Sequence, residues 1–319
     1  MIPLHNMKRK AFTMIELIFV IVIMGIIGKF GVEFLAQAYQ NFISSSINNR
    51  LQSNTTSAVE FISSRLQYRI KASTIARETN GATPPYTLLS DYFTATAPIL
   101  EWVGADIDGL RGTTTPHWSG IIDLNSTISH ATALRSPGTN TGNLNTHIST
   151  VSNGSANIND AAIYFVNPDA IPSAEGWGWD GNGAGFDTQI NDPANPNQIH
   201  PIRSTGTVTD FLPQRGDKTA TNTLAGVEAF EFYQLAWSAY AVGIAPADWD
   251  GQKGTLRLWY NYQPWQGEVY TDGNSSVIME DVSSFRFIAS GSLVKIQVCV
   301  KSDLLADEEY AICKEKTVF

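Results

Sequence analysis

Side chains that carry chemistry are scarce in this chain. Of its 319 residues, two are cysteine and five are histidine, and charged residues make up 16%. No Cys-x-x-Cys pair, His-Glu-x-x-His pair, Gly-x-Ser-x-Gly turn or Gly-x-x-x-x-Gly-Lys phosphate-binding loop occurs. The net charge of −9 argues against a nucleic-acid surface, which would be basic. These absences indicate a protein that is not an enzyme, with no cofactor and no nucleic acid as partner.

Two pairs of acidic residues come nearest to acid–base chemistry, Asp106 with Asp108 and Asp248 with Asp250. Acidic residues are rarely buried unless they are paired, so we interpret both pairs as solvated carboxylates in loops. A membrane-tethered periplasmic enzyme is the alternative that they leave open.

A long apolar run lies near the N-terminus. It extends from Phe12 to Ala36, about 37 Å of helix, which exceeds the roughly 30 Å hydrocarbon core of a bilayer. The cations at 8–10 precede it and predict a cytoplasmic N-terminus, with the rest of the chain outside the cytoplasm. No small-residue cleavage site follows the run, so we expect the helix to stay in the mature protein. Either Met1 or Met7 can be the start.

A carboxylate, Glu16, lies near the start of the apolar run, and it is the one charged residue between Met14 and Gly28. A charge at the centre of a bilayer costs about 3 kcal/mol or more, so Glu16 is expected to have a partner. If the chain is cut between Ala11 and Phe12, the new amino group of Phe12 lies one helical turn away. That amine can neutralise Glu16 in the same subunit or in a neighbour. An uncleaved anchor with a chance glutamate is the alternative.

The stretch Ala-Phe-Thr-Met-Ile-Glu-Leu at 11–17 resembles the class III signal of type IV prepilins and type II secretion pseudopilins. The resemblance implies that prepilin peptidase cuts before Phe12 and methylates its amine, and that Glu16 directs assembly. Ala11 stands where the family nearly always has Gly, and Met14 where it has Leu. The implied partners are prepilin peptidase, other pilins or pseudopilins, an inner-membrane assembly platform and membrane lipid.

The same resemblance implies a pilin-like α+β fold, in which a long N-terminal helix packs on an antiparallel sheet. We expect a cleaved leader over 1–11, a transmembrane and filament-core helix over 12–36, an amphipathic helix over 37–77 and a periplasmic β-rich domain over 78–319. Within the family the chain looks most like J-type pseudopilins or W-type minor pilins. Its mass of 34.9 kDa favours the tip or the initiation of a filament, because a bulky subunit repeats poorly at close axial spacing. A tip adhesin is the alternative.

Residue spacing adds three expectations for the helix. Gly25, Gly28 and Gly31 recur at every third position, which indicates either a compliant segment or close helix packing. Lys29 and Glu33 are four residues apart and can form an ion pair. Beyond residue 36, apolar residues at spacings of three and four predict an amphipathic helix. They are Tyr39, Phe42, Ile43, Ile47, Leu51, Ala58, Phe61, Ile62, Leu66 and Ile70.

The body of the chain is predicted to be rich in β-strands. The candidates are 99–103, 120–124, 161–166, 228–235, 236–244, 256–262, 276–281, 285–289, 293–300 and 311–318. Those after residue 226 predict an antiparallel meander. The stretches 125–159 and 168–201 are interpreted as surface excursions, the first because it is poor in large apolar residues.

A loop rich in glycine and tryptophan lies at 176–185. Asp180 and Asn182 partly match a calcium-binding turn, without the glutamate that usually completes one. Trp177 and Trp179 can instead form an aromatic contact site, or pack within a purely structural loop. The three alternatives stay open.

Cys299 and Cys313 flank a polar turn, each within a candidate strand. Paired strands would place them opposite each other, and an oxidising compartment then favours a disulfide. A bridge that closes a loop of this size contributes about 3 kcal/mol. Free thiols and metal ligation are the alternatives.

Overall fold

The computed structural model of the chain describes residues 13–78, 86–92, 98–126, 133–166, 199–214, 229–302 and 310–319. It divides into two compact units, Met1–Leu51 and Gln52–Phe319. Helix α1, Met14–Leu66, begins in the first unit and ends in the second. All of the strands among the described residues lie in the second unit.

The part of α1 in the second unit is amphipathic, as predicted. Its buried residues recur at spacings of three and four: Thr55, Ala58, Val59, Ile62, Ser63 and Leu66. Phe61 departs from the predicted apolar stripe, since it is 39% exposed and lies 5.4 Å under the guanidinium of Arg65. The helix ends at Leu66, because the N–H of Ile70 is donated to the sheet at Val103 and the chain turns into β1.

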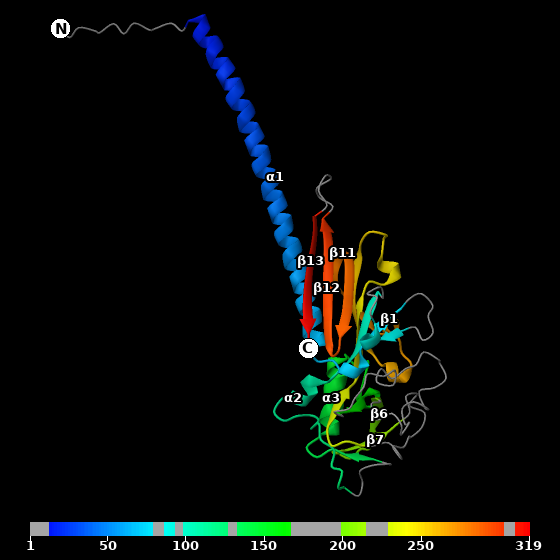
Figure 1. The fold of residues 1–319 in the computed structure, drawn as a ribbon. Helices are drawn as coiled ribbons and strands as arrows, with labels where there is room; N and C mark the ends of the chain where they lie inside the picture. Colours follow the sequence, from blue (N-terminus) through cyan, green and yellow to red (C-terminus); the bar gives the residue numbers. More distant parts are fainter. Residues whose placement is uncertain are drawn as a thin grey trace, which may run out of the picture. The chain divides into compact units, whose positions relative to one another are not determined.

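One antiparallel sheet forms the frame of the second unit (Figure 1). Among the described residues its order is β13-β12-β11-β10-β9-β3-β1-β2. The strands are β1 Ile75–Arg77, β2 Tyr86–Leu88, β3 Ile99–Gly104, β9 Ser238–Gly243, β10 Gly254–Tyr262, β11 Asn274–Ser290, β12 Leu293–Ser302 and β13 Tyr310–Val318. Strands β9 to β13 follow one another and confirm most of the predicted meander, in which 276–281 and 285–289 belong to one strand, β11. The predicted strand 228–235 does not join it, because the strand in that region, Tyr233–Ala236, belongs to a second sheet.

Short 3-10 turns link several of these elements. They span Lys71–Ser73, Leu89–Asp91, Ile158–Asp160, Pro246–Asp248, Pro264–Gln266 and Tyr270–Asp272.

The first sheet is contacted on both faces. On one face, the guanidinium of Arg65 in α1 lies 5.8 Å from the ring of Tyr240 in β9. Tyr240 in turn stacks on Trp102 of β3, with ring centroids 5.9 Å apart. On the other face, buried residues such as Ile99 and Val103 form a core cluster with strands of a second sheet.

The second sheet is built from the chain between β3 and β9. In the described residues its order is β4-β7-β6-β5-β8. The strands are β4 Leu134–Arg135, β5 Ala162–Phe165, β6 Ile199–Ser204, β7 Asp210–Pro213 and β8 Tyr233–Ala236, with helices α2 Ile107–Arg111 and α3 Thr141–Val151. Since β3 and β9 are neighbours in the first sheet, 105–237 is an insertion between two adjacent strands, hereafter the insertion.

Strand β5 shows how the insertion is held. Its side chains alternate, so that Ala162 and Tyr164 enter the cluster shared with the first sheet. Ile163 and Phe165 point to a second cluster, which belongs to the insertion and includes residues of α3. The insertion therefore has its own core on one face and is anchored to the first sheet on the other.

The structure corrects two predictions in this part of the chain. The stretch 125–159 is not only a surface excursion, because α3 lies in it and two apolar residues of that helix, Leu144 and Ile148, are fully buried. Asn140 caps the helix by accepting the N–H of Asn143. The predicted strand at 120–124 is reduced to an isolated bridge between Ile121 and Phe232.

Candidate functional site

The N-terminal end of α1 holds Glu16 in its first turn. The backbone N–H and the hydroxyl of Thr13 both donate to Oε2 of Glu16, at 3.3 and 3.1 Å. A carboxylate in this position complements the positive end of the helix. All of these groups are exposed, so the carboxylate can still accept a further partner. Ala11 and Phe12 lie outside the described residues.

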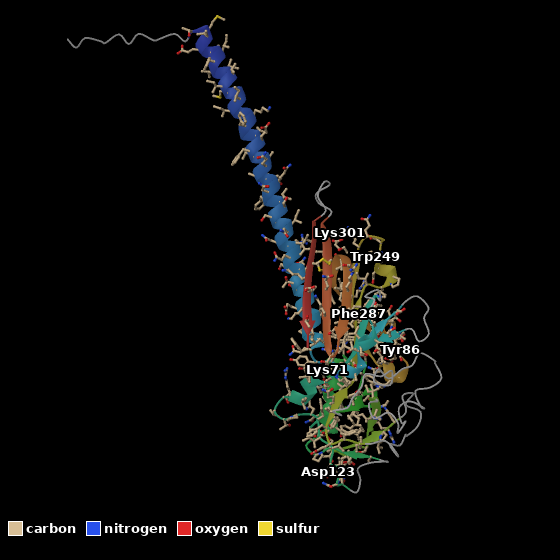
Figure 2. All side chains as sticks on the ribbon, viewed as in Figure 1. Lys71, Tyr86, Asp123, Trp249, Phe287 and Lys301 are labelled. Carbon is tan, nitrogen blue, oxygen red and sulfur yellow. A yellow bond between two sulfur atoms is a disulfide. The ribbon has the colours of Figure 1, made fainter. Side chains whose placement is uncertain are left out.

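The apolar run that follows Glu16 has nothing packed on it within its own unit. Large side chains from Met14 to Leu35 are 42% to 84% exposed, and Figure 2 shows them projecting from the helix on all sides. Soluble monomers rarely expose a continuous apolar surface of this kind. By length and composition this is the one helix in the described part of the chain that could cross a membrane.

The glycines of the run are not required by contacts in this unit. A Cβ added at Gly25, Gly28 or Gly31 would meet no atom within 4 Å. Their small size can therefore matter only for flexibility or for something that approaches the helix from outside. Lys29 and Glu33 form the expected ion pair at 3.8 Å, with both side chains more than half exposed.

The two cysteines form a disulfide between β12 and β13. Cys299 and Cys313 are direct partners in the register of these strands. The bridge ties the edge strand β13 to the sheet, and Lys316 of that strand also pairs with Glu60 of α1. The C-terminal strand is thus fastened to both its neighbour and the helix.

The residues proposed for calcium binding and for an aromatic contact site are not among those that the structure describes. Asp180, Asn182, Trp177 and Trp179 all lie outside the described residues. In the described ranges, no group of three or more His, Cys, Asp or Glu side chains is arranged to hold a metal ion.

One of the predicted solvated carboxylates is buried. Asp106 is 7% exposed, and its carboxylate accepts from Trp118 Nε1 at 3.2 Å and from the N–H of Gly109 at 3.1 Å. Nε2 of His147 lies 3.2 Å from the same carboxylate, and this hydrogen bond raises the pKa of His147. Sequence reasoning missed this cluster because the histidine and the aspartate lie on different elements with no shared motif.

The other acidic residues serve local structure. Asp248 forms a two-point ion pair with Arg257, at 2.9 and 3.4 Å. Asp250 accepts the N–H groups of Gln252 and Lys253, and these bonds lower the pKa of its carboxyl. Neither is arranged as an acid–base pair.

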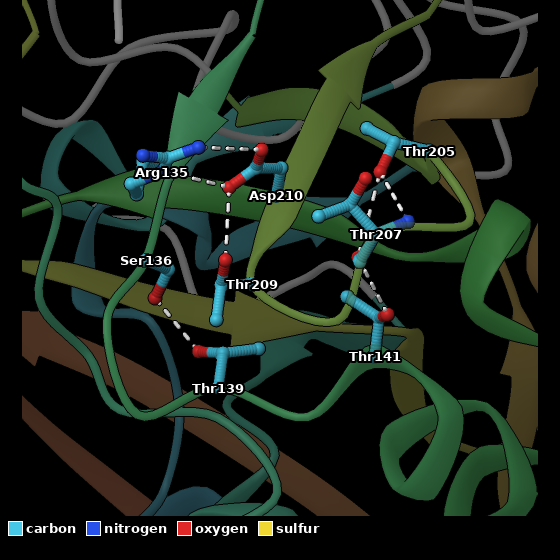
Figure 3. Close-up of polar contacts among 8 residues, drawn as sticks. All are labelled: Arg135, Ser136, Thr139, Thr141, Thr205, Thr207, Thr209 and Asp210. Carbon is cyan, nitrogen blue, oxygen red and sulfur yellow. Dashed lines mark hydrogen bonds and ion pairs between the residues drawn. The ribbon is translucent and has the colours of Figure 1, made fainter. Parts of the chain in front are cut away.

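Hydroxyl groups and one ion pair fix the far strands of the insertion (Figure 3). Arg135 of β4 pairs with Asp210 of β7 at 3.1 Å, and the Thr209 hydroxyl donates to the same carboxylate. The Arg135 guanidinium holds the pKa of Asp210 below its usual value. Ser136 bonds to Thr139 at 2.7 Å. Every group in this network is satisfied by a neighbour, which indicates a structural role.

The N-terminal segment matches one known protein family. Residues 6–28 match the family model described as the prokaryotic N-terminal methylation motif. No curated protein and no solved structure is similar enough to the chain to count as a match. The matched residues include Ala11, Phe12 and Glu16, so the motif coincides with the exposed beginning of α1.

Proposed function

The prokaryotic N-terminal methylation motif marks type IV pilin- and pseudopilin-like proteins, and because this chain carries it, we propose that it is a minor pilin or pseudopilin. It is a structural subunit of a type IV pilus or a type II secretion filament. Prepilin peptidase cuts between Ala11 and Phe12 and methylates the new amine. The subunit then joins other pilins through its N-terminal helix at the assembly platform of the inner membrane.

The observation that carries this proposal is the exposed apolar helix with a single carboxylate in its first turn. Between Met14 and Gly28, Glu16 is the one charged side chain. Thr13 satisfies part of its hydrogen-bonding capacity but does not neutralise it. A cation that approaches Glu16 in a bundle of such helices removes a cost of about 3 kcal/mol or more. The amine of Phe12, of the same subunit or of a neighbour, is that cation.

The charges around the helix support the orientation in the membrane. The cations at 8–10 keep the leader in the cytoplasm, so the β-rich unit lies in the periplasm. The disulfide between Cys299 and Cys313 supports this placement, because such bonds persist in oxidising compartments.

The insertion supports a minor subunit at the tip or in initiation. It adds a second sheet with a core of its own to the frame formed by the first sheet. A subunit that repeats along a filament needs a compact body. One that caps or starts the filament does not.

The test compares two glutamate variants of the full chain in its host. Glu16→Gln is expected to insert into the membrane at normal levels and to be absent from sheared filaments. Glu33→Gln removes a charge from the same helix and is expected to assemble normally, because the pair between Lys29 and Glu33 lies within one helix and contributes only about 0.2–0.5 kcal/mol. Normal assembly of Glu16→Gln, or equal loss in both variants, contradicts the proposal.

Mass spectrometry of the mature protein tests processing separately. The expected N-terminal residue is Phe12 with one added methyl group. A chain that keeps residues 1–11, or whose Phe12 is unmethylated, contradicts the proposed action of the peptidase.

A further inference from the structure

A cleft opens where the insertion meets the first sheet and the last turn of α1. Its volume is about 330 Å³, within the range of small-molecule sites. α1 contributes Arg65 and Tyr68 follows it, the insertion contributes Arg111 and His147, and β9 contributes Tyr240. Sites for ligands occur preferentially at such junctions between folded parts.

The two guanidinium groups in the cleft are held by aromatic rings. Arg65 lies 5.4 Å from the ring of Phe61 and 5.8 Å from that of Tyr240. Arg111 lies 5.9 Å from the ring of Tyr68 and donates to its hydroxyl at 3.5 Å. Stacking fixes the plane of a guanidinium, and its remaining N–H groups can then bind a planar anion.

The charge balance of the cleft leaves one cation unmatched. Asp108 accompanies Arg111 at 3.9 Å, and Asp106 is matched by His147 when the imidazole is protonated. No carboxylate of the described residues pairs with Arg65. The net charge is therefore that of one guanidinium, which suits a monoanion.

Three carbonyls at the end of α1 are already hydrogen-bonded. The carbonyls of Ser63, Arg65 and Leu66 accept the N–H groups of Gln67, Tyr68 and Arg69 in turn, so they present no free oxygen to the cleft. Burial raises the pKa of Tyr240, so its hydroxyl stays protonated and can donate. The walls also include Ile107, Val151 and Trp237, which would contact an apolar body.

From this geometry we propose that the cleft binds a carboxylate carried on an apolar or aromatic body, with Arg65 as its main partner. The carboxylate is either that of a small acid or the terminus of a polypeptide, since both present the same group. The site does not depend on filament assembly.

The test uses the full chain in detergent at pH 6, where His147 is protonated, and follows ligands by fluorine NMR. The probes are 4-fluorobenzoate for a small acid and N-acetyl-4-fluorophenylalanine for a chain terminus. Each is paired with its neutral amide. The fluorine resonance of at least one acid should broaden and shift when the protein is added, and the resonance of its amide should not. Arg65→Gln should weaken that binding about tenfold or more, as expected for a lost charge-assisted hydrogen bond.

The matched control is Arg286→Gln, which removes an exposed cation of β11 and should leave binding unchanged. If Arg65→Gln lowers the melting temperature, Arg111→Gln provides the same comparison, since Arg111 is 64% exposed at its side chain. The proposal is overturned if neither acid binds or if the amides bind as tightly as the acids. It is also overturned if the arginine variants of the cleft bind with the same affinity as wild type.

Discussion

A buried ion pair in the first sheet permits a quantitative test of the fold. Glu101 of β3 is fully buried and pairs with Arg77 of β1, while the hydroxyl of Tyr262 donates to its other oxygen at 2.8 Å. Glu101→Gln keeps the size and an acceptor oxygen but removes the charge. Arg77, which is 5% exposed, would then be a buried cation that has lost the charge of Glu101.

The expected cost follows from burial. Removing one partner of a buried ion pair typically costs about 3–5 kcal/mol, because the remaining charge stays desolvated. For a unit of this size, a loss of that order lowers the melting temperature by on the order of 10 °C. Adding Arg77→Met to Glu101→Gln removes both charges, so the double variant should lose less stability than the single glutamate variant.

Urea unfolding followed by tryptophan fluorescence measures these differences in the detergent-solubilised full chain. The control is Glu315→Gln, which breaks the exposed pair between Lys295 and Glu315 and should cost less than about 1 kcal/mol. If Glu101→Gln costs no more than Glu315→Gln, or if the double variant is the least stable, the argument from burial is refuted.

Two further predictions concern the insertion. The hydrogen bond to Asp106 raises the pKa of His147 in the folded state. The contribution of this pair to stability is therefore complete below the unfolded pKa of about 6.5 and is lost as pH rises through the folded pKa of His147. Between pH 6 and 8.5 the melting temperature should fall more in wild type than in His147→Gln, and equal slopes would argue against the pair. Leu144→Ala should cost about 2–5 kcal/mol of unfolding free energy, because its side chain is fully buried in the insertion core. Val151→Ala, at a position 53% exposed, should change it by less than about 0.5 kcal/mol, and similar losses in both would contradict the packing of α3.

The elements with strong periodicity were predictable from the sequence. The helix stripe at Ala58, Ile62 and Leu66 and the alternating strands after residue 254 each carry many apolar residues at a fixed spacing. The cysteine pairing was predictable too, because Cys299 and Cys313 lie on consecutive strands that pair directly. In these cases local pattern and tertiary contact agree.

The insertion was not predictable in the same way. Its strands β5 and β8 lie partly within the predicted 161–166 and 228–235, but β4 has only two residues, and β4 and β8 pair with strands far along the chain. Helix α3 has a polar composition, and two buried apolar side chains suffice to hold it once Asn140 caps its start. The cluster around Asp106 depends on this long-range packing, so no local motif reveals it.

The pairing of β3 with β9 has a consequence for the architecture of the molecule. Gly104 and Ser238, the residues at which the chain leaves and re-enters the first sheet, are direct partners across the two strands. Hairpins are commonly closed by two to five residues, so a short turn could join these positions without altering any other register. The insertion therefore leaves and re-enters the first sheet through one pair of adjacent residues, while the face of that sheet which it covers depends on it for burial.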